Sequence, residues 1–224
     1  MENYLTSRKI LTYDDLKAPE SGTSSEPLVD VRTYDPRIVA QYIKDDMRKY
    51  TGDQIYVRDT LAQKLGNVSA ELAASNLRLK VVYGYRHPEV QQAYFSKRQT
   101  EILTEFPDLS GDDLERYTHN FVAVPDVAGH PAGAAVDLTI IDMSGDDLDM
   151  GTGIADYSDP QLIRTFDSRL SNQQQNNRLV LHDLMIDQGF APFYGEWWHF
   201  SYGDREWAAF NHKKTARYCA VELT

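Results

Sequence analysis

The sequence predicts an α+β domain with a mostly antiparallel central sheet and flanking helices packed on one side of it. Two observations support this fold class. Segments with the apolar spacing of helices alternate with strand-like segments, and the last strand-like segments follow one another over short connections. No internal repeat is visible, and 224 residues are enough for one domain with a substantial core.

The N-terminal part predicts a loop, a strand and a helix in that order. Residues 18–27 are rich in Pro, Ser and Gly and predict a loop, and residues 28–34 predict a short strand. Asp35 and Pro36 suit the N-cap and the first helical position, so a helix is expected over 35–50.

The middle of the chain has the strongest periodicity. A helix from Asp59 onwards is predicted by apolar residues at steps of four, three and four, namely Leu61, Leu65, Val68 and Leu72. Residues 77–85 alternate between apolar and polar, as in a half-buried strand, and Pro88 then opens a helix that continues over 89–106. Residues 107–125 are polar and predict irregular structure.

The C-terminal part predicts a strand, a long loop, a helix and closely spaced strands. Residues 134–142 are strand-like, and the acidic, Gly-rich residues 142–160 predict a loop. Residues 173–188 predict a helix that Gly189 stops at the C′ position. Aromatic residues dominate 190–202, which again predicts strands.

Composition excludes several classes of function. The net charge is −11, which argues against a nucleic-acid partner and gives no attraction to anionic membranes. The single cysteine, Cys219, excludes an internal disulfide and a cysteine-rich zinc site. No apolar run of about 18 residues predicts a membrane span, and the first residues do not have the pattern of a secretory signal, so we expect a cytoplasmic protein.

Two short motifs together suggest a metal site. Glu196 and His199 stand three apart in "GEWWHF", and His130 stands seven residues before Asp137 in "GHPAGAAVDLTI". Two imidazoles and one carboxylate suit a catalytic Zn²⁺, because they leave a fourth position for water. Glu196 would then take a proton from that water. Residues three apart on a regular strand point to opposite sides, so Glu196 and His199 can share a cavity only at a bend or strand end.

Each motif alone is weak evidence. A lone histidine such as His130 is more often structural, and an E-x-x-H pattern arises frequently by chance. The aspartates of 142–160 do not match a calcium-binding EF-hand loop and favour a solvated loop. The two histidine motifs in this order, each within a strand-like run, make the metal site the stronger interpretation.

The motifs resemble those of a known family. "YGYRHP", "GHPAGAAVDLTI", "MGTGIADYSD" and "GEWWHF" follow one another as in D-alanyl-D-alanine dipeptidases of the vancomycin-resistance type. These belong to the LAS group of zinc peptidases, with the D,D-carboxypeptidases and the hedgehog-like domains. The resemblance covers most of residues 28–205 and implies the hedgehog and D,D-peptidase fold. It divides the chain into an N-terminal extension, 1–27, and a zinc D,D-peptidase domain, 28–224.

The resemblance also implies roles for individual residues. His130, Asp137 and His199 would bind one Zn²⁺ per chain, and Glu196 would be the general base. Arg86 would stabilise the oxyanion that forms during hydrolysis, a role that suits its permanent charge.

Two further residues are implied in substrate binding. Asp156 would hold the free amino group of the substrate, with Asp159 as a second choice, and Tyr34 would contact the substrate. In two places the sequence departs from the family: Ala128 replaces a serine, and His87 separates Arg86 from the following proline.

Three functions remain open at this point. A zinc dipeptidase acting on D-Ala-D-Ala or a similar small dipeptide is the first, and the expected cytoplasmic location favours it. The second is a D,D-carboxypeptidase or an endopeptidase that cleaves peptidoglycan stem peptides. The third is a zinc-bearing binding domain without catalytic activity. The oligomeric state is left open.

Overall fold

A five-stranded mixed sheet forms the centre of the molecule. The computed structural model describes residues 9–223, and its sheet has the strand order β2-β4-β5-β7-β6. Only the pairing of β2 with β4 is parallel, so the prediction of an α+β fold with a mostly antiparallel sheet is confirmed. The strands of this sheet are β2 (Val39–Ala40), β4 (Arg78–Tyr83), β5 (Ala135–Ile141), β6 (Ala191–Pro192) and β7 (His199–Ser201).

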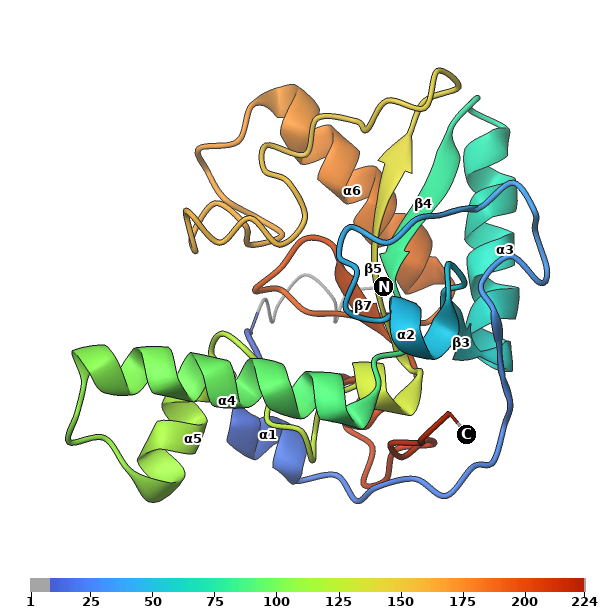
Figure 1. The fold of residues 1–224 in the computed structure, drawn as a ribbon. Coiled ribbons are helices and arrows are strands. Elements are labelled where there is room, and N and C mark those ends of the chain that lie inside the picture. Colours follow the sequence, from blue (N-terminus) through green and yellow to red (C-terminus); the bar gives the residue numbers. More distant parts are fainter. Residues whose placement is uncertain (1–8, 224) are drawn as a thin grey trace.

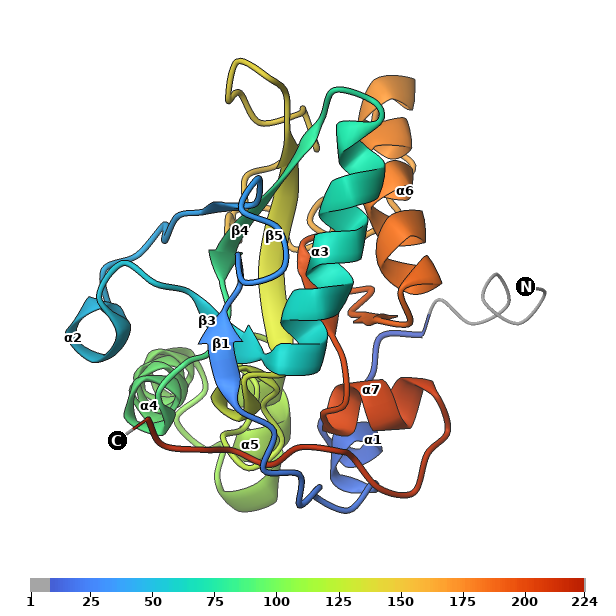
Figure 2. The ribbon, with the colours of Figure 1, turned by 90° about the vertical axis from the view of Figure 1, so that its right-hand side faces the viewer.

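Helices cover the sheet unequally. Two long helices, α3 and α6, lie side by side against one face of the sheet, whereas α1, α4, α5 and α7 gather beyond one end of it (Figures 1 and 2). A small second sheet pairs β1 (Leu28–Asp30) with β3 (Tyr56–Arg58). The helices are α1 (Tyr13–Lys17), α2 (Arg48–Thr51), α3 (Asp59–Ala73), α4 (Pro88–Glu105), α5 (Gly111–His119), α6 (Asn172–Asp187) and α7 (Arg205–Phe210).

The strongly periodic segments fold as predicted. The apolar face of α3 is buried, with Leu61, Leu65, Val68 and Leu72 at most 2% exposed. Gly189 follows α6 with φ of 80°, a left-handed conformation that glycine adopts without strain. The acidic segment 142–160 contains no helix or extended strand, as its composition predicts.

The expected helix over 35–50 is wrong. The Asp35 carboxylate accepts hydrogen bonds from the backbone and guanidinium of Arg37, and the Asp35 carbonyl accepts one from Ile38 N, so a turn forms. Val39 and Ala40 then pair with β4, and only four residues, Arg48–Thr51, are helical. The backbone hydrogen bonds with β4 thus decide the structure of this segment, although Asp35 and Pro36 have the sequence pattern of a helix start.

The irregular segment expected over 107–125 contains a helix. Helix α5 has Asp112 and Asp113 in its first turn and Arg116 and His119 in its last, which suits the helix dipole. It is short and mostly polar: Leu114 and Tyr117, three apart, are its two apolar residues, and Thr118 is its one fully buried side chain.

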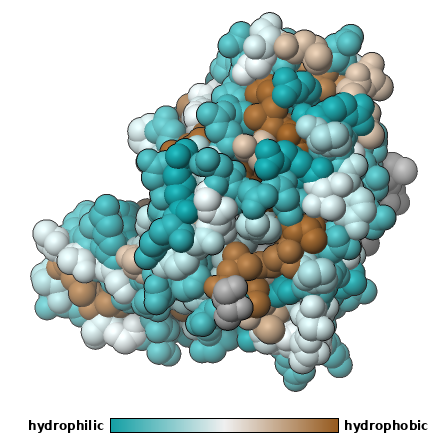
Figure 3. All heavy atoms as spheres, turned by 45° about the vertical axis from the view of Figure 1, so that its right-hand side comes forward, coloured by the Kyte–Doolittle hydropathy of each residue, from teal (hydrophilic) through white to brown (hydrophobic). Residues whose placement is uncertain are grey.

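The N-terminal segment packs against the domain. Tyr13 and Leu16 of α1 are buried together with Phe95 of α4, and the Tyr218 hydroxyl donates to Glu26 over 2.9 Å. The division at 27/28 stays a prediction, and its residues 1–8 and 224 lie outside the described part. Within residues 9–223, no helix combines the length and the apolar composition needed to cross a bilayer. The face in Figure 3 is mostly hydrophilic, and its hydrophobic residues form separate patches.

Candidate active site

Strand pairing brings the three proposed metal ligands together. Asp137 and His199 are opposite each other in the register of β5 and β7, where side chains on one face lie close. His130 comes from a single 3-10 turn, His130–Ala132, just before β5. Asp137 Oδ1 lies 2.9 Å from His199 Nδ1, and Asp137 Oδ2 lies 3.4 Å from His130 Nε2. One potential ligand atom from each residue lies within 4.8 Å of the other two, which suits a single ion.

Each imidazole is oriented by its second nitrogen. His130 Nδ1 lies 2.7 Å from the Gly84 carbonyl, which can only accept, so Nδ1 carries the proton and Nε2 is left to bind a metal. In His199 the nitrogens have the opposite roles: Nδ1 faces Asp137, and Nε2 lies 3.9 Å from Glu206 Oε2. A backbone carbonyl thus supports one histidine, and a carboxylate on α7 faces the other.

Several acidic groups are buried together around the proposed ligands. Burial alone would raise the pKa of Asp137, but His130 and His199 outweigh burial and hold it well below its usual value. Burial raises the pKa of Asp204 to about 6 and that of Glu206 to about 8. Asp204 Oδ2 and Glu206 Oε1 are buried and have no hydrogen-bond partner among the described residues. Such a cluster favours a divalent cation, and the donor set fits Zn²⁺.

Glu196 lies beside the ligands but is not one of the three. It belongs to a turn that ends where β7 begins, with Glu196 N bonded to the Phe193 carbonyl over 3.0 Å. Glu196 and His199 both line one cavity, so the bend that the E-W-W-H spacing required is present. Burial raises the pKa of Glu196 to about 6, and the Tyr157 hydroxyl donates to its Oε1 over 3.0 Å.

Arg86 is held in the same cavity. Its Nη1 donates to Gln91 Oε1 over 2.8 Å, and its guanidinium carbon lies 4.5 Å from the centre of the Tyr83 ring. Its Nε is buried and has no hydrogen-bond partner within residues 9–223. The interposed His87 is the N-cap of α4, and its Nδ1 accepts from Glu89 N, so the insertion starts the helix without displacing Arg86 from the cavity.

The cavity is large enough for a small peptide. Its volume is about 290 Å³, and Ala128 lies in its wall where the family has a serine. A second cavity of about 610 Å³ shares Tyr157, Phe193 and Glu196 with the first. The two volumes therefore meet at the general-base candidate.

The two proposed substrate-binding residues lie elsewhere. The Tyr34 hydroxyl bonds to Asp59 over 2.9 Å, and the Asp156 carboxylate accepts from Ser158 N over 3.1 Å. Neither Tyr34 nor Asp156 is in the cavity wall. Their roles stay predictions, and Tyr157, next to Asp156, is the residue of this loop that reaches Glu196.

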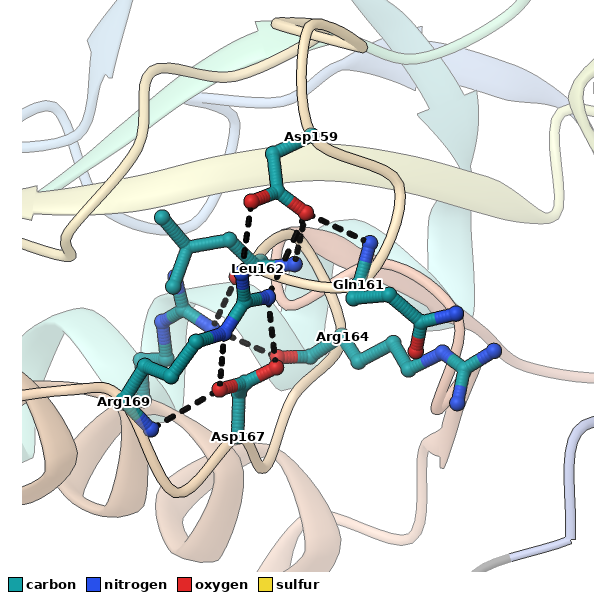
Figure 4. A network of polar contacts seen from close by, with 7 residues as sticks. Asp159, Gln161, Leu162, Arg164, Asp167 and Arg169 are labelled. Carbon is teal, nitrogen blue, oxygen red and sulfur yellow. Dashed lines mark hydrogen bonds and ion pairs between the residues drawn. The ribbon is translucent and has the colours of Figure 1, made fainter.

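The loop around Tyr157 is fastened by two arginines. Arg169 bridges Asp159 and Asp167 over 2.7 and 2.9 Å, and the Asp159 carboxylate also accepts from backbone N–H groups of the loop (Figure 4). The buried Arg178 of α6 donates to the carbonyls of Met150 and Leu162, 12 residues apart in the chain. Asp159 is therefore committed to the loop's own structure.

Sequence reasoning missed Tyr157 and Glu206. Tyr157 stands in the loop whose aspartates were the predicted substrate-binding residues, and no sequence motif marks Tyr157 itself. Glu206 follows His199 by seven residues on the short helix α7, for which Asp204 is the N-cap. The sequence signal that could have indicated Glu206 is a carboxylate that closely follows a proposed ligand histidine and stands two residues after the N-cap of a helix.

Comparison with known proteins agrees with these observations. A family model described as D-Ala-D-Ala dipeptidase, of the M15 peptidases, matches residues 26–217. A D-alanyl-D-alanine dipeptidase of Streptomyces coelicolor is 34% identical over 158 residues, which cover 68% of this chain and 75% of the relative. One from Synechocystis is 37% identical over 108 residues, and one from Escherichia coli is 36% identical over 73.

The matches differ in extent. The Synechocystis alignment spans 42% of this chain and 44% of that relative. The Escherichia coli alignment spans 33% of this chain and 37% of that relative. Among solved structures, the LD-carboxypeptidase LdcB aligns over 85% of this chain and 75% of its own, with a TM-score of 0.47 and 19% identity. A mutant of the vancomycin-resistance D,D-pentapeptidase VanY in complex with Zn(II) covers 73% and 82%, with a TM-score of 0.42 and 19% identity. On the extent of the family match, the chain belongs to the D-Ala-D-Ala dipeptidase family of the M15 peptidases.

Proposed function

We propose that this protein is a zinc-dependent dipeptidase that hydrolyses D-Ala-D-Ala or a similar small dipeptide. The observation that carries the proposal is the convergence of His130, Asp137 and His199 within 4.8 Å, beside Glu196 in one cavity. Membership of the D-Ala-D-Ala dipeptidase family and the similarity to D-alanyl-D-alanine dipeptidases support this choice of substrate.

The residues divide the reaction between them. Bound by His130, Asp137 and His199, Zn²⁺ would lower the pKa of water to about 7 and polarise the peptide carbonyl. Glu196 accepts a proton from the attacking water and passes it to the amine that leaves when the C–N bond breaks. Arg86 stabilises the negative charge that develops on the carbonyl oxygen.

A panel of dipeptides tests the proposal. Zinc-loaded protein should contain one Zn²⁺ per chain and should hydrolyse D-Ala-D-Ala faster than its L,L, L,D and D,L isomers. The N-acetylated D-Ala-D-Ala analogue should be cleaved poorly, because a dipeptidase requires the free amine. Absence of bound zinc, or of cleavage of every dipeptide in the panel, would contradict the proposal.

One observation favours the second candidate, a D,D-carboxypeptidase. The cavity continues past Tyr157 and Glu196 into a larger volume lined by apolar residues such as Phe121 and Ile163, which offers room for a longer peptide. Faster cleavage of the N-acetylated substrate than of free D-Ala-D-Ala would establish this activity instead.

Glu206 should control how tightly zinc is held. Its Oε2 lies 3.9 Å from His199 Nε2, the position from which a carboxylate orients a ligand histidine. Glu206→Gln is therefore expected to raise the zinc dissociation constant about 10–100-fold, measured by competition with a fluorescent chelator. Glu101→Gln is the matched control, since Glu101 lines the same cavity but pairs with Arg98. Equal zinc affinity of Glu206→Gln and the control would refute the role.

A further inference from the structure

One wall of the cavity holds two cations against a single tyrosine ring. Lys44 Nζ lies 5.0 Å from the centre of the Tyr94 ring, and the guanidinium carbon of Arg86 lies 5.3 Å from the same point. Burial, and after it the charge of Arg86, lower the pKa of Lys44. Two like charges held together beside a cavity repel each other, and an anion bound between them would relieve that repulsion.

Among the described residues, Lys44 forms no ion pair, in contrast to two other cations of this wall. Arg98 pairs with Glu101 over 3.0 Å, and Lys97 lies 4.0 Å from the same carboxylate. The nearby Asp46 carboxylate instead accepts from the hydroxyls of Tyr83 and Tyr94. In the part of the chain that the structure describes, the contact found for Lys44 is the Tyr94 ring, so its N–H donors are free for a ligand.

Lys44 lies at the edge of the cavity that contains the proposed ligands. It belongs to the connection between β2 and α2, beside the N-terminal end of α4 (Figure 1). It lines both the cavity of the metal site and a neighbouring cavity of about 360 Å³. Arg86, from the segment between β4 and α4, lines the same cavity, and the charge of Asp137 acts to raise the pKa of both cations.

The side chains of the cavity differ in how they act on an anion. Lys44 and Arg86 attract a carboxylate, whereas Glu196 repels one once it has lost its proton. A dipeptide, like any substrate of a carboxypeptidase, ends in a free carboxylate one residue beyond the bond that breaks. An endopeptidase substrate has no carboxylate there.

We propose that Lys44 binds the C-terminal carboxylate of the peptide substrate, next to Arg86. The assignment rests on the proposed peptidase function and deepens it, since it restricts the substrates to peptides whose C-terminal residue is the one released. A charge-assisted hydrogen bond from the ammonium would fix the peptide before Glu196 acts.

Kinetics on two substrates test the role of Lys44. D-Ala-D-Ala and its C-terminal amide differ only in the group that Lys44 would bind. Lys44→Met is expected to raise KM for the acid about 10–100-fold, with kcat changed less than about threefold, and to change KM for the amide less than about twofold. Lys97→Met, a lysine of the same wall that lies near Glu101, should behave as the unmodified protein does.

A binding measurement separates failure of this inference from failure of the proposed function. In zinc-loaded protein carrying Glu196→Gln, calorimetry gives dissociation constants for the acid and the amide without turnover. With Lys44 present the acid should bind about 10–100-fold more tightly than the amide, and Lys44→Met should abolish the difference. If the active protein hydrolysed neither the acid nor the amide, the proposed dipeptidase function would be refuted, whereas the binding role of Lys44 would not. Equal binding of acid and amide, or binding of neither, would overturn the role of Lys44.

Discussion

Glu196→Gln is expected to lower kcat for D-Ala-D-Ala by at least about 10³-fold while zinc stays bound. Glutamine has nearly the same shape but cannot accept the proton of the attacking water, and general acid–base catalysis contributes about 10²–10⁴-fold in enzymes. Burial raises the pKa of Glu196 to about 6, a value suited to taking a proton and returning it near neutral pH. Steady-state kinetics and zinc content, measured on the same preparation, check both parts.

The control for this variant is Glu101→Gln, which removes a carboxylate from the same cavity wall. Glu101 lies beside Arg98 on α4 and should leave kcat within about twofold, the range usual for a surface change. If Glu196→Gln kept both its zinc and its activity, the third interpretation of the sequence, a zinc-bearing binding domain without catalysis, would replace the peptidase.

Asp137→Asn should abolish the metal site itself. The Asp137 carboxylate faces both histidines, at 2.9 Å from His199 Nδ1 and 3.4 Å from His130 Nε2, and it supplies the negative charge of the ligand set. Loss of one partner from a buried ionic group costs about 3–5 kcal/mol, which corresponds to about 10²–10⁴-fold in zinc affinity. Competition with a chelator measures the change, and activity should fall with zinc occupancy.

The asparagine preserves shape, so the pairing of β5 with β7 should persist. Asp147→Asn is the matched control, because Asp147 is an exposed carboxylate whose partner is Lys80. A normal circular dichroism spectrum with lost zinc would assign the effect to the ligand. Unchanged zinc affinity would show that the metal lies elsewhere.

The proposed ligands could be named because their two motifs and the family resemblance can be recognised in the sequence itself. Asp137 and His199 stand within strand-like runs, and antiparallel pairing of two such runs places them opposite each other. The helix expected over 35–50 failed because a capping signal cannot reveal that residues 39 and 40 pair with β4. Helix α5 was missed because it is short and mostly polar, so its two apolar residues, Leu114 and Tyr117, give only a weak periodic signal.

The supporting residues were beyond prediction for a different reason. Lys44 meets the ring of Tyr94 only through a contact between segments 50 residues apart, and Glu206 faces His199 only because the chain turns back between β7 and α7. No periodicity or spacing encodes such meetings. Tyr157 was not predicted because the neighbouring aspartates suit the binding of a substrate amino group better. The structure places these aspartates outside the cavity wall.

The fastening of the Tyr157 loop by Arg178 and Arg169 bears on inhibitor design. A binding site that is already rigid loses little conformational entropy when a ligand binds. Rigid ligands that match its shape should therefore bind with higher affinity than flexible ones. Cyclic phosphinate mimics of the dipeptide, locked in one conformer, would therefore be the better starting compounds.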